Sequence, residues 1–347
     1  MSEKLFSQQL LAWFDQHGRK NLPWQQPATP YRVWLSEVML QQTQVSTVIP
    51  YFQRFVVRFP DIRSLAEAST DEVLQYWAGL GYYARGRNLH KAAVIMAQQH
   101  NAAIPENFDA LLALPGIGRS TAGAIMALAF QHRYPILDGN VKRVLCRFTA
   151  EPDWPGQKNI ETALWQLAES LLPERRINAY IQAQMDLGAT VCTRSKPDCH
   201  CCPLQTNCLG RQTGKPEHYP VRKKKPALPE RHCRWLIYRQ SEKILLEKRP
   251  EKGIWGGMWS FPEINIDMPM DAILARHAVD DMIDLTPIRH TFTHFRLQII
   301  PLLIDINQHD QIETNDNQQW VTITDSLSLA LPAPVNKLIQ KLNRGVT

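Results

Sequence analysis

The sequence predicts an all-α domain followed by a smaller α+β domain, and changes in residue pattern along the chain support this division. Residues 1–210 show apolar residues at helical spacing, whereas residues 232–347 contain short strand-like runs. Between them, residues 211–231 are rich in Pro and Lys and hold few large apolar residues, which is typical of a linker. With 347 residues, the chain is long enough for two domains that each bury a core.

Helical periodicity is clearest at the start of the chain and around residue 75. Apolar residues that would share a helical face are Leu5, Phe6, Leu10, Trp13 and Phe14, then Val73, Leu74 and Trp77. After the linker, the pattern changes to runs typical of strands at 233–238, 243–249 and 294–304. We therefore expect helices at the first two places and strands at the last three.

The net charge of +6 is unevenly distributed. Residues 1–225 hold 26 Lys and Arg against 18 Asp and Glu, whereas residues 226–347 hold 13 against 15. A basic first part indicates contact with a polyanion, although an ordinary solvated surface could carry the same charge. No secretory signal and no apolar run of membrane-spanning length is visible, so we expect a cytoplasmic protein with no membrane partner.

Four cysteines within 17 residues form the most informative motif. The pattern C-x6-C-x2-C-x5-C is made by Cys192, Cys199, Cys202 and Cys208. Zinc sites with four cysteines usually use two short C-x2-C pairs, whereas one short pair between two longer gaps suits the corners of a [4Fe-4S] cluster. The spacing favours iron–sulfur over zinc, and it favours Cys202 over the adjacent Cys201 as the ligand.

A glycine-rich turn opens an apolar helix within residues 114–130. Gly116 and Gly118 allow sharp turning and close approach by a partner. The N–H groups at the following helix start, around Ser120, can hold a phosphate oxygen. Because a plain helix–helix connection shows the same pattern, this motif alone is weak evidence for DNA binding.

Two acidic residues are candidates for acid–base chemistry. Asp138 directly precedes a helical run, where it can cap the helix and be held ionised by N–H groups, with Asn140 as a hydrogen-bond partner. Glu37 interrupts an apolar helix, and partial burial there would raise its pKa and let it carry a proton at neutral pH. The alternative for Glu37 is a place at the edge of the apolar stripe, paired with Arg32.

Residues 79–93 interleave glycine, aromatic and basic side chains. The tyrosines are Tyr82 and Tyr83, and the basic residues are Arg85, Arg87 and Lys91. Such a loop suits contact with the phosphate backbone and insertion into a base stack. Core packing is the alternative for either tyrosine.

Together these motifs resemble those of the helix–hairpin–helix DNA glycosylases of the endonuclease III superfamily, and within it the adenine-specific branch. The resemblance covers nearly the whole chain and is carried, in order, by SEVMLQQTQV, GLGYYARGRN, LPGIGRSTAGAI, LDGNVKR and the cysteine pattern. It implies a helical glycosylase domain with a [4Fe-4S] cluster loop at 192–208, then a NUDIX-like domain. It also implies a monomer that excises adenine opposite 8-oxoguanine or guanine from double-stranded DNA in base excision repair, and hence a nucleoid-associated protein.

The resemblance assigns roles to individual positions. Glu37 matches the residue that protonates adenine, and Asp138 matches the one that stabilises the oxocarbenium-like sugar. The expected DNA contacts are Trp24 and Gln182 at the adenine pocket, Gln41 and Tyr82 beside the mismatched guanine, Gly116, Gly118 and Ser120 in the hairpin, Arg194 and Lys196 in the cluster loop, and Phe292, Thr293 and His294 in the HTFTHF segment that reads 8-oxoguanine.

Three departures from related families refine this expectation. Ser120 stands where lyases of the superfamily have a lysine, so a Schiff base is not expected from this position and the enzyme should be monofunctional. Relatives often have Ser where this chain has Thr293, which keeps the hydroxyl. The second domain lacks the acidic box of NUDIX hydrolases, so pyrophosphate hydrolysis is not expected. The rival functions are a bifunctional lyase acting on oxidised pyrimidines and a non-catalytic iron–sulfur DNA-binding protein. If lyase activity were found, Lys20 or Lys142 would be the candidate amine.

Overall fold

The chain folds into two compact units in the computed structural model, which describes residues 3–223, 227–269, 279–307 and 312–344. The first, called the helical unit below, comprises Met1–Glu67 and Asn88–Lys224. The second unit comprises Ala68–Arg87 and Lys225–Thr347. The sequence predicted a helical domain over 1–210; by spatial proximity, residues 68–87 group with the strand-rich part of the chain.

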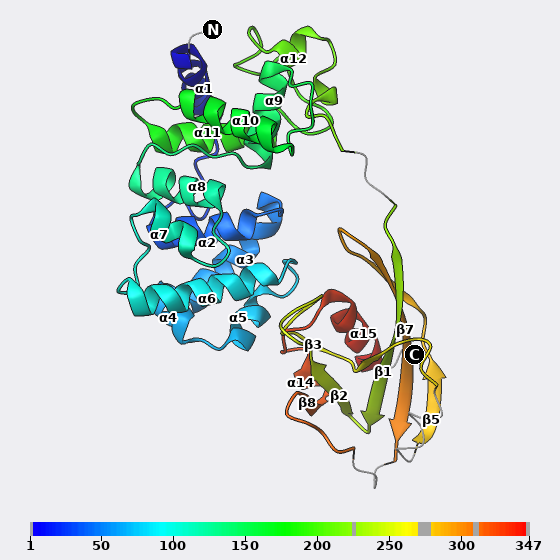
Figure 1. Ribbon diagram of the computed structural model, residues 1–347. Helices are drawn as coiled ribbons and strands as arrows, with labels where there is room; N and C mark the ends of the chain where they lie inside the picture. Colours follow the sequence, from blue (N-terminus) through cyan, green and yellow to red (C-terminus); the bar gives the residue numbers. More distant parts are fainter. Residues whose placement is uncertain (1–2, 224–226, 270–278, 308–311, 345–347) are drawn as a thin grey trace. The chain divides into compact units, whose positions relative to one another are not determined.

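Short helices make up the chain before the linker (Figure 1). They are α1 (Glu3–His17), α2 (Pro30–Leu40), α3 (Val45–Arg58), α4 (Ile62–Glu67), α5 (Thr70–Trp77), α6 (Ala84–Gln99), α7 (Phe108–Ala113), α8 (Arg119–Phe130), α9 (Gly139–Thr149), α10 (Lys158–Ser170), α11 (Ile177–Thr190) and α12 (Leu209–Gln212). A 3-10 turn follows at Pro216–His218. The predicted all-helical first part is confirmed.

The apolar stripe of α1 packs into a core shared with α9, α10 and α11. Its buried members are Phe6, Leu10, Trp13 and Phe14. The prediction that Leu5 shares this face is wrong, because Leu5 lies in the first turn at the edge of the stripe and is 39% exposed. The predicted face of α5 is confirmed, since Val73, Leu74 and Trp77 are all fully buried.

The described part of the second unit is built around an eight-stranded sheet. Five of its strands follow the order β3-β2-β1-β7-β5. In addition, β4 pairs with β1, β6 with β7 and β8 with β2. The strands are β1 (Glu230–Gln240), β2 (Lys243–Lys248), β3 (Trp259–Ser260), β4 (Glu263–Ile264), β5 (Val279–Asp284), β6 (Ile288–Thr291), β7 (Arg296–Ile306) and β8 (Gln318–Thr322). The three predicted strand runs are confirmed as β1, β2 and β7. The sequence did not predict that β1 and β7, 11 residues each, would pair in parallel at the centre of the sheet.

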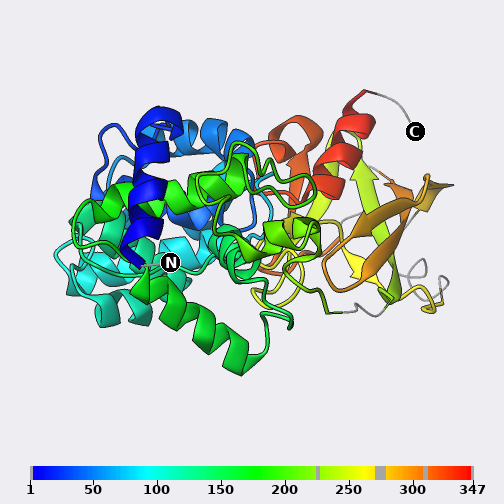
Figure 2. The same cartoon turned by 90° about the horizontal axis from the view of Figure 1, so that it is seen from above.

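Two helices end the second unit, α14 (Ile323–Ser326) and α15 (Ala333–Asn343). Figure 2 shows α15 beside the strands. Its buried residues recur at helical spacing and are Pro334, Val335, Leu338, Ile339 and Leu342. The β-rich part therefore has the α+β composition that the sequence predicted.

Part of the predicted linker 211–231 is fixed by hydrogen bonds. The Arg147 guanidinium, on α9, donates through Nε to the carbonyl oxygens of Pro216 (2.9 Å) and Tyr219 (3.0 Å). At its other end, β1 begins at Glu230, inside the predicted linker. Residues 224–226 of the linker lie outside the described residues. Among those described, no helix combines the length and apolarity needed to cross a membrane.

Gly123 is the position where α8 packs closest against the chain that leads to α9. A Cβ atom there would lie 2.3 Å from the carbonyl oxygen of Pro135, so Gly123→Ala should force the two segments apart. We expect a loss of about 1–3 kcal/mol in the free energy of unfolding, measured by thermal or urea denaturation. Gly139→Ala is the control, since its Cβ would meet nothing within 4 Å. Equal melting temperatures for the two variants would contradict the packing described here.

Candidate active site

A cavity of about 390 Å³ in the helical unit brings together both predicted catalytic residues and several of the predicted DNA contacts. It lies where α2 ends, α8 and α9 begin and α11 passes. The predicted residues that line it are Trp24, Glu37, Gln41, Ser120, Asp138, Asn140 and Gln182. Residues far apart in the sequence thus converge on one polar cavity that is large enough for a nucleobase.

Glu37 reaches this cavity from a helix that is otherwise largely buried. The helix, α2, begins at Pro30 after Thr29, whose side chain accepts a hydrogen bond from the Arg32 N–H. The Glu37 side chain is half-buried, and burial raises its pKa to about 8, with a smaller contribution from the negative charge of Asp138. The Arg32 guanidinium donates to the Pro23 carbonyl (2.6 Å). A pKa raised to this extent favours the protonated form of Glu37 at neutral pH.

Asp138 caps the N-terminus of α9, as the sequence predicted. Its Oδ1 accepts a hydrogen bond from the Val141 N–H (2.8 Å). Burial raises the pKa of Asp138, while the N–H groups of Val141 and Asn140, the Arg143 charge and the Asn140 side chain lower it. These four interactions favour the carboxylate form and oppose burial, which is the larger effect and leaves the pKa of Asp138 raised overall.

The glycine turn sits next to Asp138 and is tied to it. The Ser120 Oγ accepts a hydrogen bond from the Leu137 N–H (3.1 Å), one residue before Asp138. Gly116 has φ +81°, and a Cβ there would lie 2.9 Å from the Asn88 Cβ, so this position requires glycine. Gly118 is exposed and caps α8, which leaves the first N–H groups of that helix facing outward.

Gln41 and Trp24 complete the walls of the cavity. The Gln41 side-chain amide donates to Thr121 Oγ1 (3.2 Å) and the Gly116 carbonyl (3.4 Å), which joins the end of α2 to the glycine turn. Trp24 is 5% exposed and packs edge-on against Phe52, with ring centroids 5.4 Å apart. The cavity therefore has one aromatic wall and one polar wall.

Sequence reasoning missed an ion pair on the polar wall. The Arg19 guanidinium donates to Asp186 Oδ1 through Nε (2.9 Å) and Nη2 (2.7 Å), and its backbone N–H donates to Oδ2 (2.7 Å). The Gln182 amide donates to the same carboxylate (2.9 Å). Asp186 is fully buried, one helical turn after Gln182, and this spacing was the only signal for it in the sequence. The network fixes the orientation of the Gln182 amide in the cavity wall.

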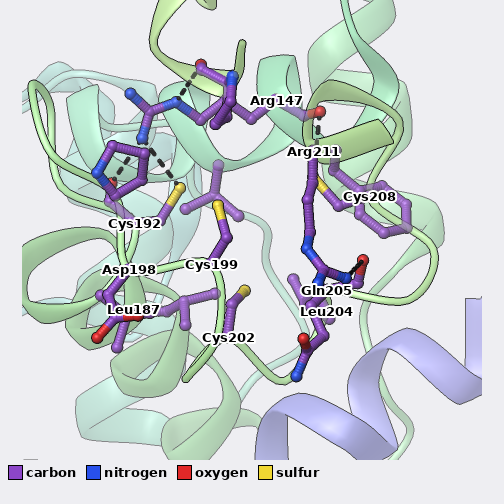
Figure 3. Close-up of a pocket in the computed structure, with 15 residues that line it drawn as sticks. Arg147, Leu187, Cys192, Asp198, Cys199, Cys202, Leu204, Gln205, Cys208 and Arg211 are labelled. Carbon is purple, nitrogen blue, oxygen red and sulfur yellow. Dashed lines mark hydrogen bonds between the residues drawn. The ribbon is translucent and has the colours of Figure 1, made fainter. Parts of the chain in front are cut away.

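The four cysteines of the motif line a second pocket of the helical unit (Figure 3). They are Cys192, Cys199, Cys202 and Cys208, whereas Cys201 is exposed. Burial raises the pKa of Cys202 to about 12, and the charges of the other three thiols add to this shift, which reflects their proximity. Within the described ranges, no three His, Cys, Asp or Glu side chains converge closely enough to hold a single metal ion.

Arg147 organises the chain around this pocket. Its Nη1 donates to the Cys192 sulfur (3.3 Å) and to the Thr193 carbonyl (2.6 Å), and its Nη2 donates to the Arg194 carbonyl (2.9 Å). The side chains of Arg194 and Lys196 are exposed on the same loop. Arg147 itself is 2% exposed, and sequence reasoning did not identify it.

The remaining predicted residues lie in the second unit. The HTFTHF segment covers the end of β6 and the turn at 292–295 that leads to β7, and this turn is closed by a hydrogen bond from the Phe292 N–H to the Phe295 carbonyl (2.9 Å). Thr293 and His294 are exposed at its tip, whereas Phe292 stacks on Phe295. Tyr82 is 46% exposed and has φ +48°. Its neighbour Tyr83 is buried, so the core-packing alternative holds for Tyr83 only.

Comparisons with known proteins agree with this arrangement. The family model described as HhH-GPD superfamily base excision DNA repair protein matches residues 35–170, and the NUDIX domain model matches residues 234–341. Among solved structures, a thermostable thymine-DNA glycosylase superposes with a TM-score of 0.56 at 26% identity, over 61% of this chain and 97% of that chain. An endonuclease III–DNA complex has a TM-score of 0.52 at 19% identity, over 62% of this chain and 98% of its own, which shows the shared fold.

Curated relatives extend over both units. The chain is 37% identical to adenine DNA glycosylase of Buchnera aphidicola subsp. Acyrthosiphon pisum, over 100% of both chains. It is 32% identical to adenine DNA glycosylase of Homo sapiens, over 96% of this chain and 73% of the relative. The predicted fold and family are confirmed: the chain is a DNA glycosylase of base excision repair and belongs to the adenine DNA glycosylase family.

Proposed function

We propose that this enzyme hydrolyses the N-glycosidic bond of adenine placed opposite 8-oxoguanine or guanine in duplex DNA, acting as a monofunctional glycosylase and as a monomer. The observation that carries the proposal is the pairing of Glu37 and Asp138 in one cavity, with the pKa of Glu37 raised to about 8. One acid that keeps its proton and one that is stabilised as an anion form the arrangement that glycosidic cleavage requires.

The reaction begins with extrusion of the adenine nucleotide, because its glycosidic bond is inaccessible within the helix. Glu37 then donates its proton to a ring nitrogen of adenine, which makes the base a better leaving group. Asp138, held by the Val141 N–H, offsets the positive charge that develops on the sugar. The electron pair of the broken bond leaves with adenine, and water adds to the sugar.

The polar wall of the cavity would hold the extruded base. The Gln182 amide is oriented by Asp186, and Asp186 is neutralised by Arg19, so the wall presents fixed hydrogen-bonding groups. Trp24 supplies an apolar surface on the other side. Preorganised groups of this kind position the base relative to Glu37 without reorganisation during the reaction.

The absence of lyase chemistry is supported by the surroundings of the nearby amines. Ser120 offers a hydroxyl that is engaged with the Leu137 N–H. The Lys142 ammonium lies 2.8 Å from Glu161, and the Lys20 ammonium donates to the Asp15 carbonyl (2.6 Å). Both amines are engaged in these interactions, so neither lysine is positioned to form a Schiff base with the sugar.

The cysteine pocket fits a [4Fe-4S] cluster held by Cys192, Cys199, Cys202 and Cys208. Such a cluster takes one thiolate at each of four irons, so its ligands lie further apart than around a single ion. Arg147 would donate a hydrogen bond to the ligating sulfur of Cys192, and cluster sulfurs commonly receive such bonds. When bound, the cluster supplies a rigid anchor for the loop, and Arg194 and Lys196 on that loop would contact phosphate.

The β6–β7 turn is the proposed reader of 8-oxoguanine. The hydroxyl of Thr293 is exposed, and its oxygen lies 3.4 Å from Nδ1 of His294. Phe292 packs beneath them on Phe295 and Trp255, with ring centroids 4.7 and 5.2 Å away. Packed aromatic rings support the exposed polar side chains of this turn, and this arrangement suits hydrogen bonding to the edge of a nucleobase.

The pH dependence of adenine release should follow the ionisation of Glu37. Because the protonated form is the acid, the single-turnover rate on an adenine–8-oxoguanine duplex should fall as pH rises through about 8. Glu37→Gln fills the same space without a transferable proton, so it should bind the duplex but react about 10²–10⁴-fold more slowly. A wild-type rate that does not decline above pH 9 would assign the acid to another residue.

Cys199→Ser should remove the cluster. We expect loss of bound iron and of the broad visible absorbance, and weaker DNA binding, because the basic loop loses its anchor. Cys201→Ser is the matched control, since Cys201 is exposed and its change should leave the iron content intact. Stoichiometric zinc without iron in the purified protein would contradict the assignment, as would equal iron loss in both variants.

Duplexes with adenine opposite 8-oxoguanine, guanine or thymine test the substrate assignment. The wild-type enzyme should release adenine from the first two, measured by alkaline cleavage at the abasic site.

Thr293→Ala should reduce the preference for 8-oxoguanine over guanine by about fivefold, the equivalent of one neutral hydrogen bond of about 1 kcal/mol. Thr291→Ala, an exposed residue at the end of β6, is the control. An unchanged preference in Thr293→Ala would place the reader elsewhere.

A further inference from the structure

The turn that presents Tyr82 is held firmly by its own neighbours. The Gly81 carbonyl accepts hydrogen bonds from the Trp77 indole N–H (3.2 Å) and from Nη2 of Arg85 (3.2 Å). The Arg85 guanidinium also lies 5.4 Å from the centre of the Tyr82 ring. The turn that carries Tyr82 is therefore joined by side-chain contacts to the segments on either side of it.

Both of these segments are attached to the strand-rich part of the second unit. Before the turn, the Asp71 carboxylate at the start of α5 pairs with the Lys248 ammonium of β2 (2.7 Å). After the turn, Nη1 of Arg87 donates to the carbonyl oxygen of Gly256. The turn is thus anchored at two points, one on each side.

The loop that anchors Arg87 also supports the β6–β7 turn. Gly256 follows Trp255, whose ring lies 5.2 Å from the ring of His290 and 5.2 Å from that of Phe292. Gly256 cannot carry a side chain without displacement, since its Cβ would lie 2.1 Å from the Glu251 carbonyl oxygen. Direct contacts therefore connect the β6–β7 turn, through residues 255–256, to the segment that carries Tyr82.

We propose that Asp71, Lys248, Arg87 and the Trp255–Gly256 loop are positioning residues that couple recognition at the β6–β7 turn to the placement of Tyr82 in the DNA. This inference rests on the proposed function, because it takes Thr293 as the contact to 8-oxoguanine and Tyr82 as the side chain inserted beside it. Binding of 8-oxoguanine at the turn would hold the loop, and the loop would hold Tyr82 where it can enter the base stack.

The ion pair permits a test by charge reversal. Asp71→Lys and Lys248→Asp should each reduce the ratio of single-turnover rates for 8-oxoguanine over guanine by about two- to fivefold, the range for a partly exposed ion pair. The double variant restores opposite charges and should recover the ratio. A second readout, in the Glu37→Gln background, is the fluorescence of 2-aminopurine placed beside 8-oxoguanine, which reports insertion into the stack without chemistry.

Arg239→Gln provides a matched control. Arg239 pairs with Asp305 (2.6 Å) between β1 and β7, and this ion pair has similar exposure but joins two strands that include neither residues 68–87 nor the loop 255–256. This variant should lose stability without losing the rate ratio. The coupling is supported if the single variants lower both readouts and the double variant recovers them.

Several results would overturn the coupling. They are unchanged readouts in the single variants, no recovery in the double variant, or an equal loss of the ratio in Arg239→Gln. A wild-type enzyme that releases no adenine from either mispair would instead overturn the proposed function. The 2-aminopurine signal would then still report whether the ion pair positions Tyr82.

Discussion

Glu37 and Asp138 share one poorly solvated cavity, and the N-terminus of α9 favours the negative charge at Asp138. Removal from water disfavours ionisation of both carboxyl groups, and ionisation of either makes that of the other harder. The N–H groups at the start of α9 stabilise a carboxylate only at Asp138. The capping bond from Val141 is therefore both a structural and an electrostatic requirement of the site.

The N-terminus of the neighbouring helix α8 can also stabilise a negative charge, but it has no side-chain cap. At α8 the cap is Gly118, which has no side chain to accept the first N–H groups, so those groups are left for an external acceptor. Ser120, in the first turn of α8, joins this helix start to the residue before Asp138. An anion bound at the glycine turn would therefore be fixed in position relative to Asp138, the proposed catalytic carboxylate.

Features encoded within one segment could be predicted from the sequence, whereas those that depend on distant residues could not. Asp138 was identifiable as a cap because its partner is three residues away. Glu37 stood out because it is an acid in an apolar helix. The role of Asp186 could not be predicted, because its ion-pair partner Arg19 is 167 residues away and α11 offers only the spacing from Gln182 as a signal. For the same reason the sequence predicted neither the parallel pairing of β1 with β7 nor the grouping of residues 68–87 with the second unit.

Arg147 makes long-range hydrogen bonds to two separate loop segments. Its guanidinium donates to carbonyl oxygens at 192–194 in the cysteine loop and at 216 and 219 before the second unit. The carbonyl groups of both segments are satisfied by a single buried cation, so neither segment needs regular secondary structure to be ordered. The short loops around the four cysteines follow from this arrangement. The chain can remain irregular there, and so bring four thiols to one pocket, because Arg147 on the rigid helix α9 supplies the hydrogen bonds that a helix or strand would otherwise provide.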